Sequence, residues 1–270
     1  MASNLSTIGF TFIDEDSFRT TMMGCATEST VRLACGAGTY GIWRARSGAE
    51  VWFHLTNAEN GSTEIVGLTP FFEGQSEVLL KITESVSRND DNPFEGALKG
   101  WVSPDDGSDG SYPIQFEAVD FAASNTNTWP DLRHVRLTAF ARELQAFPSD
   151  EAYYAARGEP NSEVPKLAAH AYIPIGLFAA DVDGADDASN QPQSESSALL
   201  TGKIIEHRVL TNDTTGQEFV WLLVESLEAT FDIVADPAIV TGELIDGGTI
   251  EAAVVMFGRL LENAEPDAAA

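Results

Sequence analysis

A glycine-rich run near the N-terminus has the spacing of a dinucleotide-binding turn. Gly36, Gly38 and Gly41 match the pattern G-x-G-x-x-G and follow an apolar segment, as they would where a strand leads into a helix that holds a pyrophosphate. The turn signal Ser47-Gly48 follows too soon to leave room for the crossover helix that this chemistry requires. We therefore expect a hairpin turn here and no nucleotide site.

Two acidic segments could offer oxygen ligands to a calcium ion. Asp105, Asp106 and Asp109 lie in one predicted turn. Counted from Asp105, however, the position where an EF-hand loop needs a bidentate glutamate is Phe116. The aspartates of 181–187 show no ligand pattern either. We interpret both segments as solvated, and we predict no metal site.

Nucleophilic chemistry would need a thiol beside a base that ionises it. Cys35 is the candidate thiol, and the candidate bases are His54, His134, His170 and His207. Cys25 and Cys35 both fall on apolar faces of predicted elements, so we expect them to pack in the core. They form no C-x-x-C pair, and the common serine-hydrolase, phosphate-loop and zinc-protease motifs do not occur in the sequence. We predict no catalytic, cofactor-binding or metal-binding residue.

The charge balance excludes some partners. Asp and Glu number 42 against 15 Lys and Arg, which gives a formal net charge of −27. Such a surface repels phosphate backbones and anionic lipids, so no direct nucleic-acid or membrane partner is expected. Lysine is scarce among the basic residues, and this composition is typical of salt adaptation. An acidic face that docks a basic partner is the alternative explanation of the charge.

Length and hydropathy bound the class of protein. A chain of 270 residues with 43% hydrophobic content can bury a core of its own. The N-terminus carries neither a basic segment nor a long apolar run, and no stretch reaches the roughly 18 apolar residues of a membrane span. We expect a cytoplasmic protein with reduced cysteines.

Most of the chain shows the period-two hydrophobic pattern of strands, in short runs bounded by Gly, Pro, Asn and Asp. Strands are predicted at 31–35, 40–46, 49–55, 65–72, 77–86, 97–102, 112–121, 132–141, 171–178, 199–210, 218–226 and 230–235. Helices are predicted at 14–25, behind Asp14 or Asp16 as the cap, and at 149–157. The run 250–261 fits a helix as well, but Val254-Val255 and Gly258 favour a strand.

These elements predict a mainly β (β-rich α+β) fold. A sandwich- or barrel-like main domain with one or two short helices is expected over 1–180, and a flexible acidic linker over 181–198. A small C-terminal β-barrel, similar to an OB-fold, is expected over 199–263, with a disordered tail at 264–270. No fixed-period repeat is predicted, although 94–100 and 200–206 echo each other faintly.

The leading functional hypothesis is a non-enzymatic binding module that presents an acidic surface to a basic protein partner or to a small molecule. One alternative is a hydrolase that uses scattered carboxylates or a Cys35–histidine pair. Another is an acidic mimic of nucleic acid. The five tryptophans could line a pocket, but we expect them in the core. The sequence predicts neither an enzyme class nor an oligomeric state.

Overall fold

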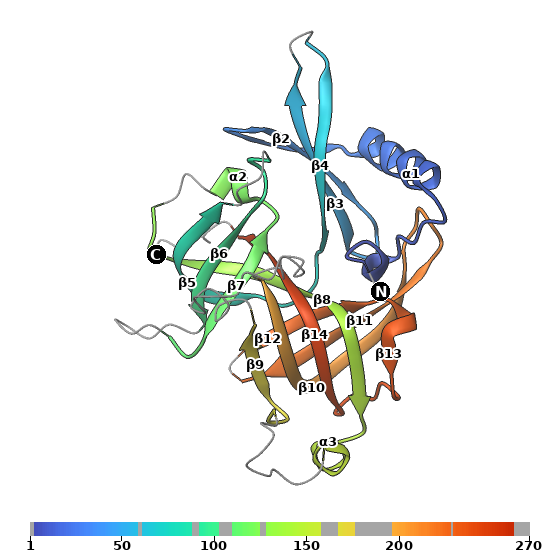
Figure 1. The fold of residues 1–270 in the computed structure, drawn as a ribbon, viewed down its shortest axis with the longest axis vertical. Coiled ribbons are helices and arrows are strands. Elements are labelled where there is room, and N and C mark those ends of the chain that lie inside the picture. Colours follow the sequence, from blue (N-terminus) through green and yellow to red (C-terminus); the bar gives the residue numbers. More distant parts are fainter. Residues whose placement is uncertain are drawn as a thin grey trace, which may run out of the picture.

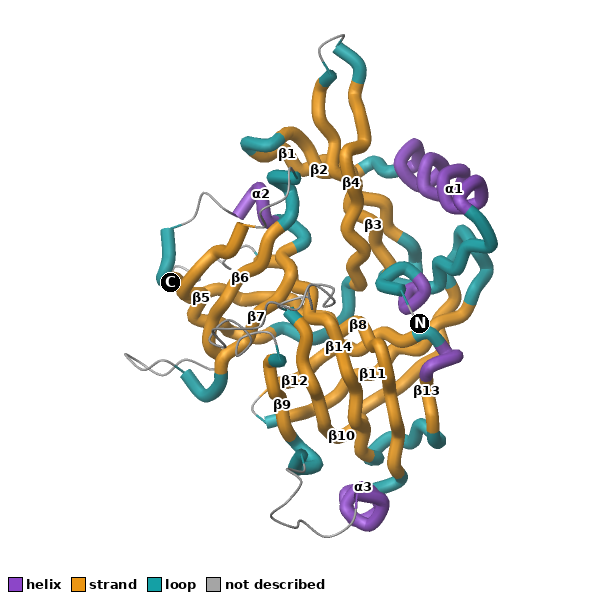
Figure 2. Tube along the Cα trace, viewed as in Figure 1, coloured by secondary structure: helices purple, strands orange, loops and turns teal. Residues whose placement is uncertain are grey.

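The structure is a computed structural model, and it describes residues 3–58, 61–87, 92–102, 110–124, 128–157, 167–175, 196–227 and 229–261. It confirms the mainly β prediction, and Figure 2 shows strands making up the body of the molecule. The strands are β1 (Val31–Cys35), β2 (Gly38–Arg44), β3 (Ala49–Asn57), β4 (Thr63–Phe72), β5 (Val78–Ser87), β6 (Gly96–Val102), β7 (Pro113–Ala118), β8 (Asp131–Phe147), β9 (Ala171–Pro174), β10 (Ser197–Thr211), β11 (Glu218–Ser226), β12 (Ala229–Ala235), β13 (Val240–Thr241) and β14 (Thr249–Leu260). The helices are η1 (Ser6–Ile8), α1 (Glu15–Glu28), α2 (Phe121–Ser124), α3 (Asp150–Arg157) and η3 (Pro237–Ile239). No helix in these ranges is long and apolar enough to cross a membrane.

Two sequence expectations are confirmed: the start of the first helix behind Asp14 and the strand at 250–261. Helix α1 begins behind Asp14, whose carboxylate accepts a hydrogen bond from the Ser17 amide at 2.8 Å, while the Ser17 hydroxyl accepts one from the Asp14 amide. This reciprocal pair satisfies two of the amides that a helix start leaves open. The ambiguous run 250–261 is strand, because β14 hydrogen-bonds along its length to β8 and β10.

Parts of the predicted organisation lie outside the described residues. They are the tail at 264–270, the linker at 181–198 apart from its last three residues, and the acidic turn with Asp105, Asp106 and Asp109. The domain division therefore stays a prediction. The strand pairings do show that segments from both sides of the predicted linker belong to one sheet, because β8 pairs with β14.

A four-stranded antiparallel sheet, here called the small sheet, is formed by the N-terminal strands in the order β1-β2-β3-β4. In Figure 1 it lies above the other strands, with α1 beside it. Its inner face packs on the large sheet through a shared apolar cluster, which includes Trp52, Phe71, Phe140 and Phe257. The small sheet therefore covers part of the large sheet's outer face.

The large sheet closes on itself into two five-stranded rings that share two strands. In the first ring, β5, β6 and β7 follow one another, and β14 and β8 close the circle. In the second ring, β10, β11 and β12 follow one another, and β8 and β14 close the circle. The interiors hold the larger apolar core. The second ring contains the strands predicted for a C-terminal barrel, but it takes its fifth strand from Asp131–Phe147.

The two rings are built alike, which reveals an internal repeat. Each half of the repeat supplies a three-stranded meander, then a short helix, then one long strand: β5, β6, β7, α2 and β8 match β10, β11, β12, η3 and β14. In each ring the third strand runs parallel to the long strand of the other half, as β12 does with β8 and β7 with β14. The faint sequence echo of 94–100 and 200–206 is therefore out of register, because it aligns β6 with β10.

One row of side chains crosses the outer face where the rings join. Glu117 on β7, Phe257 on β14, Thr138 on β8 and Asp232 on β12 are consecutive partners across four adjacent strands. Residues paired in this way point to the same side of a sheet. We call these four residues the cross-strand row. Its two ends are acids, and both are at matched positions of the repeat.

The connection from β4 to β5 seals one half of the cross-strand row. The Thr138 hydroxyl donates to the Phe72 carbonyl at 2.9 Å, and Asp232 accepts the Ser76 amide at 2.6 Å. A Cβ added at Gly74 would lie only 2.1 Å from Asp232 Cγ, so the chain can approach this closely only as glycine. The Glu117–Phe257 half is not covered by this connection.

Candidate functional site

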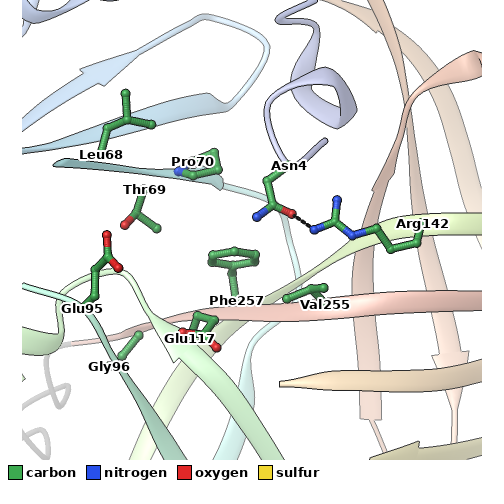
Figure 3. Close-up of a pocket in the computed structure, with 11 residues that line it drawn as sticks. Asn4, Leu68, Thr69, Pro70, Glu95, Gly96, Glu117, Arg142, Val255 and Phe257 are labelled. Carbon is green, nitrogen blue, oxygen red and sulfur yellow. Dashed lines mark hydrogen bonds between the residues drawn. The ribbon is translucent and has the colours of Figure 1, made fainter. Parts of the chain in front are cut away.

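A cavity of about 210 Å³ lies over the Glu117–Phe257 half of the cross-strand row. Figure 3 shows Thr69 and Pro70 of β4 on one side of it and the Phe257 ring at its base. The remaining lining residues are Asn4, Leu68, Glu95, Gly96, Glu117, Ala118, Arg142 and Val255. This volume is below the roughly 300–1,000 Å³ of drug-sized sites, so the cavity suits a small ligand. We call it the inter-sheet cavity.

Opposite charges line different ends of the inter-sheet cavity. Figure 3 shows Glu95 on the left, the Arg142 guanidinium on the right beside Asn4, and Glu117 between them below the Phe257 ring. Glu117 is only 8% exposed, and its Oε1 accepts the Ser196 hydroxyl at 2.9 Å. Arg142 donates from Nη2 to Asn4 Oδ1 at 2.6 Å. Burial lowers the pKa of Arg142 from its ordinary value, but an arginine keeps its charge at neutral pH.

A buried histidine helps to position Glu95. His54 on β3 is fully buried, and its ring stacks on Phe94 at 5.0 Å between centroids. The Asn92 amide nitrogen lies 3.1 Å from His54 Nδ1 and donates to Glu95 Oε1 at 3.0 Å. Because this amide can only donate, Nδ1 accepts, and the ring proton is assigned to Nε2, which faces the Thr69 hydroxyl at 3.2 Å.

His54 also makes stability depend on pH. Burial lowers the pKa of His54 from 6.5 to about 4. The unfolded chain therefore binds a proton at a higher pH than the folded protein, and stability is lost as pH falls from 6.5 towards 4. We expect urea unfolding of the wild type to lose about 2–3 kcal/mol more than His54→Gln between pH 7.5 and pH 4.5. Equal losses in the two proteins would show that His54 does not titrate in this way.

The glycine-rich run is a hairpin turn, as predicted. Cys35 ends β1 and Gly38 begins β2, and the two strands pair antiparallel. Gly38 has a φ of 147°, and a Cβ there would lie 2.3 Å from the Leu55 carbonyl oxygen. The glycine therefore permits close packing of the turn on β3, a role that needs no nucleotide.

The contacts of the cysteines and histidines in the described residues do not include a thiol–imidazole pair. Cys25 is buried, and burial raises its pKa to about 11, so it is a poor nucleophile. Cys35 is half-buried, and no hydrogen bond joins it to a histidine within the described ranges. Three histidines pair with carboxylates instead: His134 with Glu77, His170 with Asp150 and His207 with Asp246. Of the five tryptophans expected in the core, Trp43, Trp52 and Trp221 are buried there, while Trp101 and Trp129 are only half-buried.

The residues of the inter-sheet cavity carried no sequence signal. Glu95, Glu117 and Arg142 come from three segments that are far apart in the chain, and only the ring pairings bring these segments together. Among the described residues, no group of three or more His, Cys, Asp and Glu is placed so that it could bind a metal ion. The site is therefore a polar cavity between two sheets of a mainly β protein. No protein-family model, curated protein or solved structure matches the chain.

Proposed function

We propose that the chain is a binding module for a small zwitterion, a compound that carries an ammonium and a carboxylate group as a free amino acid does. The observation that carries this proposal is the placement of opposite charges at the two ends of one small cavity. Of the two partners that the sequence suggested for a binding module, a basic protein or a small molecule, this proposal takes the small molecule.

The acidic end suits the ammonium group. Ammonium–carboxylate hydrogen bonds are about twice as strong as neutral ones, and their strength grows where water is excluded. Glu117 is nearly buried, and Glu95 is held by Asn92, so neither carboxylate needs much reordering to receive a ligand. The face of Phe257 at the base of the cavity adds a cation–π contact.

The basic end suits the carboxylate group. A guanidinium has five N–H donors in a planar fork that matches a carboxylate. The hydrogen bond from Arg142 Nη2 to Asn4 Oδ1 helps to fix the orientation of the guanidinium. Such preorganisation lowers the entropy cost of binding.

The proposal is tested by thermal unfolding with ligand panels at fixed ionic strength. We expect small free amino acids to raise Tm saturably, because they bind the native state. Their methyl esters, which keep only the cation, and their N-acetyl derivatives, which keep only the anion, should give much smaller shifts. Arg142→Gln and Glu117→Gln should each weaken binding by about 10–100-fold, the cost of one charge-assisted hydrogen bond.

Two exposed variants control for charge alone. Arg19→Gln removes a positive charge from α1, where the side chain is 68% exposed, and Glu143→Gln removes a negative charge from an exposed position beside Arg142. Both should bind as the wild type does. If no amino acid shifts Tm, or if Arg19→Gln weakens binding as much as Arg142→Gln, the proposal is wrong.

A further inference from the structure

A second cavity, of about 560 Å³, opens on the small sheet, and none of its described lining residues belongs to the inter-sheet cavity. Its lining includes Arg32, Ala34, Thr39, Leu55, Asn57 and Thr63, and we call it the outer groove. Its volume lies within the usual range of small-molecule sites. We propose that the outer groove binds an organic carboxylate, with the anionic group on Arg32 and an apolar body over Leu55.

The strand register places these side chains on one face of the small sheet. The cross-strand partners are Arg32 with Gly41, Ala34 with Thr39, Thr39 with Leu55, and Asn57 with Thr63. Tyr40, which precedes Gly41 in β2, points to the rings, because its hydroxyl donates to the Phe94 carbonyl at 2.9 Å and accepts the Ala122 amide at 3.0 Å. Successive residues of a strand point to opposite faces. The outer groove therefore lies on the face turned away from the rings.

The Arg32 guanidinium is oriented by oxygen atoms at the end of α1. Its Nη1 donates to the carbonyl oxygen and the hydroxyl of Ser29, at 2.7 and 2.8 Å, and to the Val31 carbonyl at 3.2 Å. Gly41 leaves room for this arrangement, because a Cβ there would lie 3.0 Å from Arg32 Nη1 and 3.0 Å from Leu55 Cδ1. These contacts place the guanidinium beside Leu55. They all use Nη1, so the other nitrogens of the fork remain for a ligand.

Arg32 has no carboxylate partner among the described residues, unlike most arginines of the chain. Ion pairs with Asp or Glu are formed by Arg19, Arg44, Arg46, Arg133, Arg136, Arg157, Arg208 and Arg259. The described lining of the outer groove also contains no Asp or Glu, although the chain has 42 of them. A guanidinium without a competing carboxylate is a receptor for the carboxylate of a ligand.

The rest of the outer groove calls for more than an inorganic anion. Leu55 is half-buried and Ala34 is exposed on its floor, so an apolar body would cover both side chains. Each methylene that is fully buried there tightens binding by about fourfold. The side chains of Thr39, Asn57 and Thr63 add hydroxyl and amide groups that can bind polar substituents of the ligand.

Calorimetric titration with butyrate, hexanoate and hexanol at pH 7.5 and fixed ionic strength tests this site. Both acids are fully ionised at this pH. Hexanoate should bind saturably and more tightly than butyrate, by roughly four- to tenfold for two partly buried methylenes. Hexanol has the same apolar body without the charge, so it should bind at least tenfold more weakly than hexanoate. If neither acid binds saturably, or if hexanol binds as tightly as hexanoate, the inference is overturned.

Matched variants locate the binding. Arg32→Gln should weaken hexanoate binding at least tenfold, whereas Arg19→Gln, which removes an exposed charge from α1, should not change it. Ala34→Leu keeps every charge but fills the outer groove from an exposed position of β1, so it should weaken binding similarly. Arg142→Gln should bind hexanoate normally, which separates this site from the inter-sheet cavity. Unchanged affinity in Arg32→Gln or in Ala34→Leu would overturn the inference, even if the other variant failed to fold.

Discussion

Replacing Asp232 by alanine should lower the free energy of unfolding by about 3–5 kcal/mol, the largest effect that we expect from one substitution. Asp232 is fully buried, and its carboxylate accepts the Trp221 indole N–H at 2.7 Å and the Ser76 amide at 2.6 Å. A backbone hydrogen bond from Gln75 reaches the same group. Alanine would leave these donors buried and unpaired, at about 1–3 kcal/mol each.

Urea unfolding followed by tryptophan fluorescence measures this loss. Asp236→Ala is the control from the same segment, because Asp236 follows β12 and caps η3, and loss of this helix cap should cost about 1 kcal/mol. Asp232→Asn should fall between the two, because its amide keeps one acceptor. A loss below about 1.5 kcal/mol for Asp232→Ala would show that the hydrogen bonds of Asp232 do not hold the β4–β5 connection in place over the sheet.

Replacing Glu73 by alanine should cost about 2–3 kcal/mol and should loosen the junction between the small sheet and the rings. Glu73 lies between β4 and β5 and binds three arginines: Arg44 at 2.9 Å, Arg136 at 2.8 Å and Arg259 at 2.9 Å. These come from β2, β8 and β14, so one carboxylate ties the two sheets together. The cost is below the roughly 3–5 kcal/mol of a fully buried pair, because Glu73 is 27% exposed.

A neighbouring carboxyl group strengthens this junction. Glu50 is fully buried, and its pKa is raised by burial and by its hydrogen bond with Glu73. Burial alone would raise the pKa of Glu73 too, but that hydrogen bond and the arginines lower it overall. The hydrogen bond between the two carboxyl groups therefore favours the neutral form of Glu50, while the arginines favour the charged form of Glu73.

The control for Glu73→Ala is Glu77→Ala in the same connection. Glu77 pairs with His134, and both side chains are about half exposed, so its loss should cost under about 1 kcal/mol. Glu73→Gln should be milder than Glu73→Ala, since one acceptor remains. Equal urea midpoints for Glu73→Ala and Glu77→Ala would show that the arginine cluster does not hold the sheets together.

Local patterns in the sequence predicted local structure well. Alternating apolar residues predicted the small-sheet strands and β12, a continuous apolar run predicted β11, and the Asp14 cap predicted the start of α1. The pair Val254-Val255 and Gly258 favoured strand for β14 over an equally regular helical spacing, and β14 is a strand. These features depend on neighbours within a few residues, which a single sequence displays.

The rings and the cavity depend on pairings that a single sequence does not display. Strand β8 pairs with β14, which lies more than a hundred residues later in the chain. The parallel partners of β7 and β12 are β14 and β8, which do not follow them directly in the sequence. Nothing near Glu117 distinguishes it from the other carboxylates, because its partners on the cavity wall come from β4, β8 and β14. The repeat is not visible in the sequence because matched positions hold different residues, as with Glu117 and Asp232 or Phe257 and Thr138.

Saturation-transfer NMR on an equimolar mixture of small amino acids, at constant ionic strength, tests the central claim most directly. Constant salt is needed because the net charge is −27, so any added ion screens the repulsion between surface carboxylates and changes stability without binding a site. The zwitterion proposal predicts saturation transfer from the wild type to at least one amino acid, and its loss in Arg142→Gln but not in Arg19→Gln. No transfer to any amino acid, or equal transfer in Arg142→Gln, would contradict the proposal.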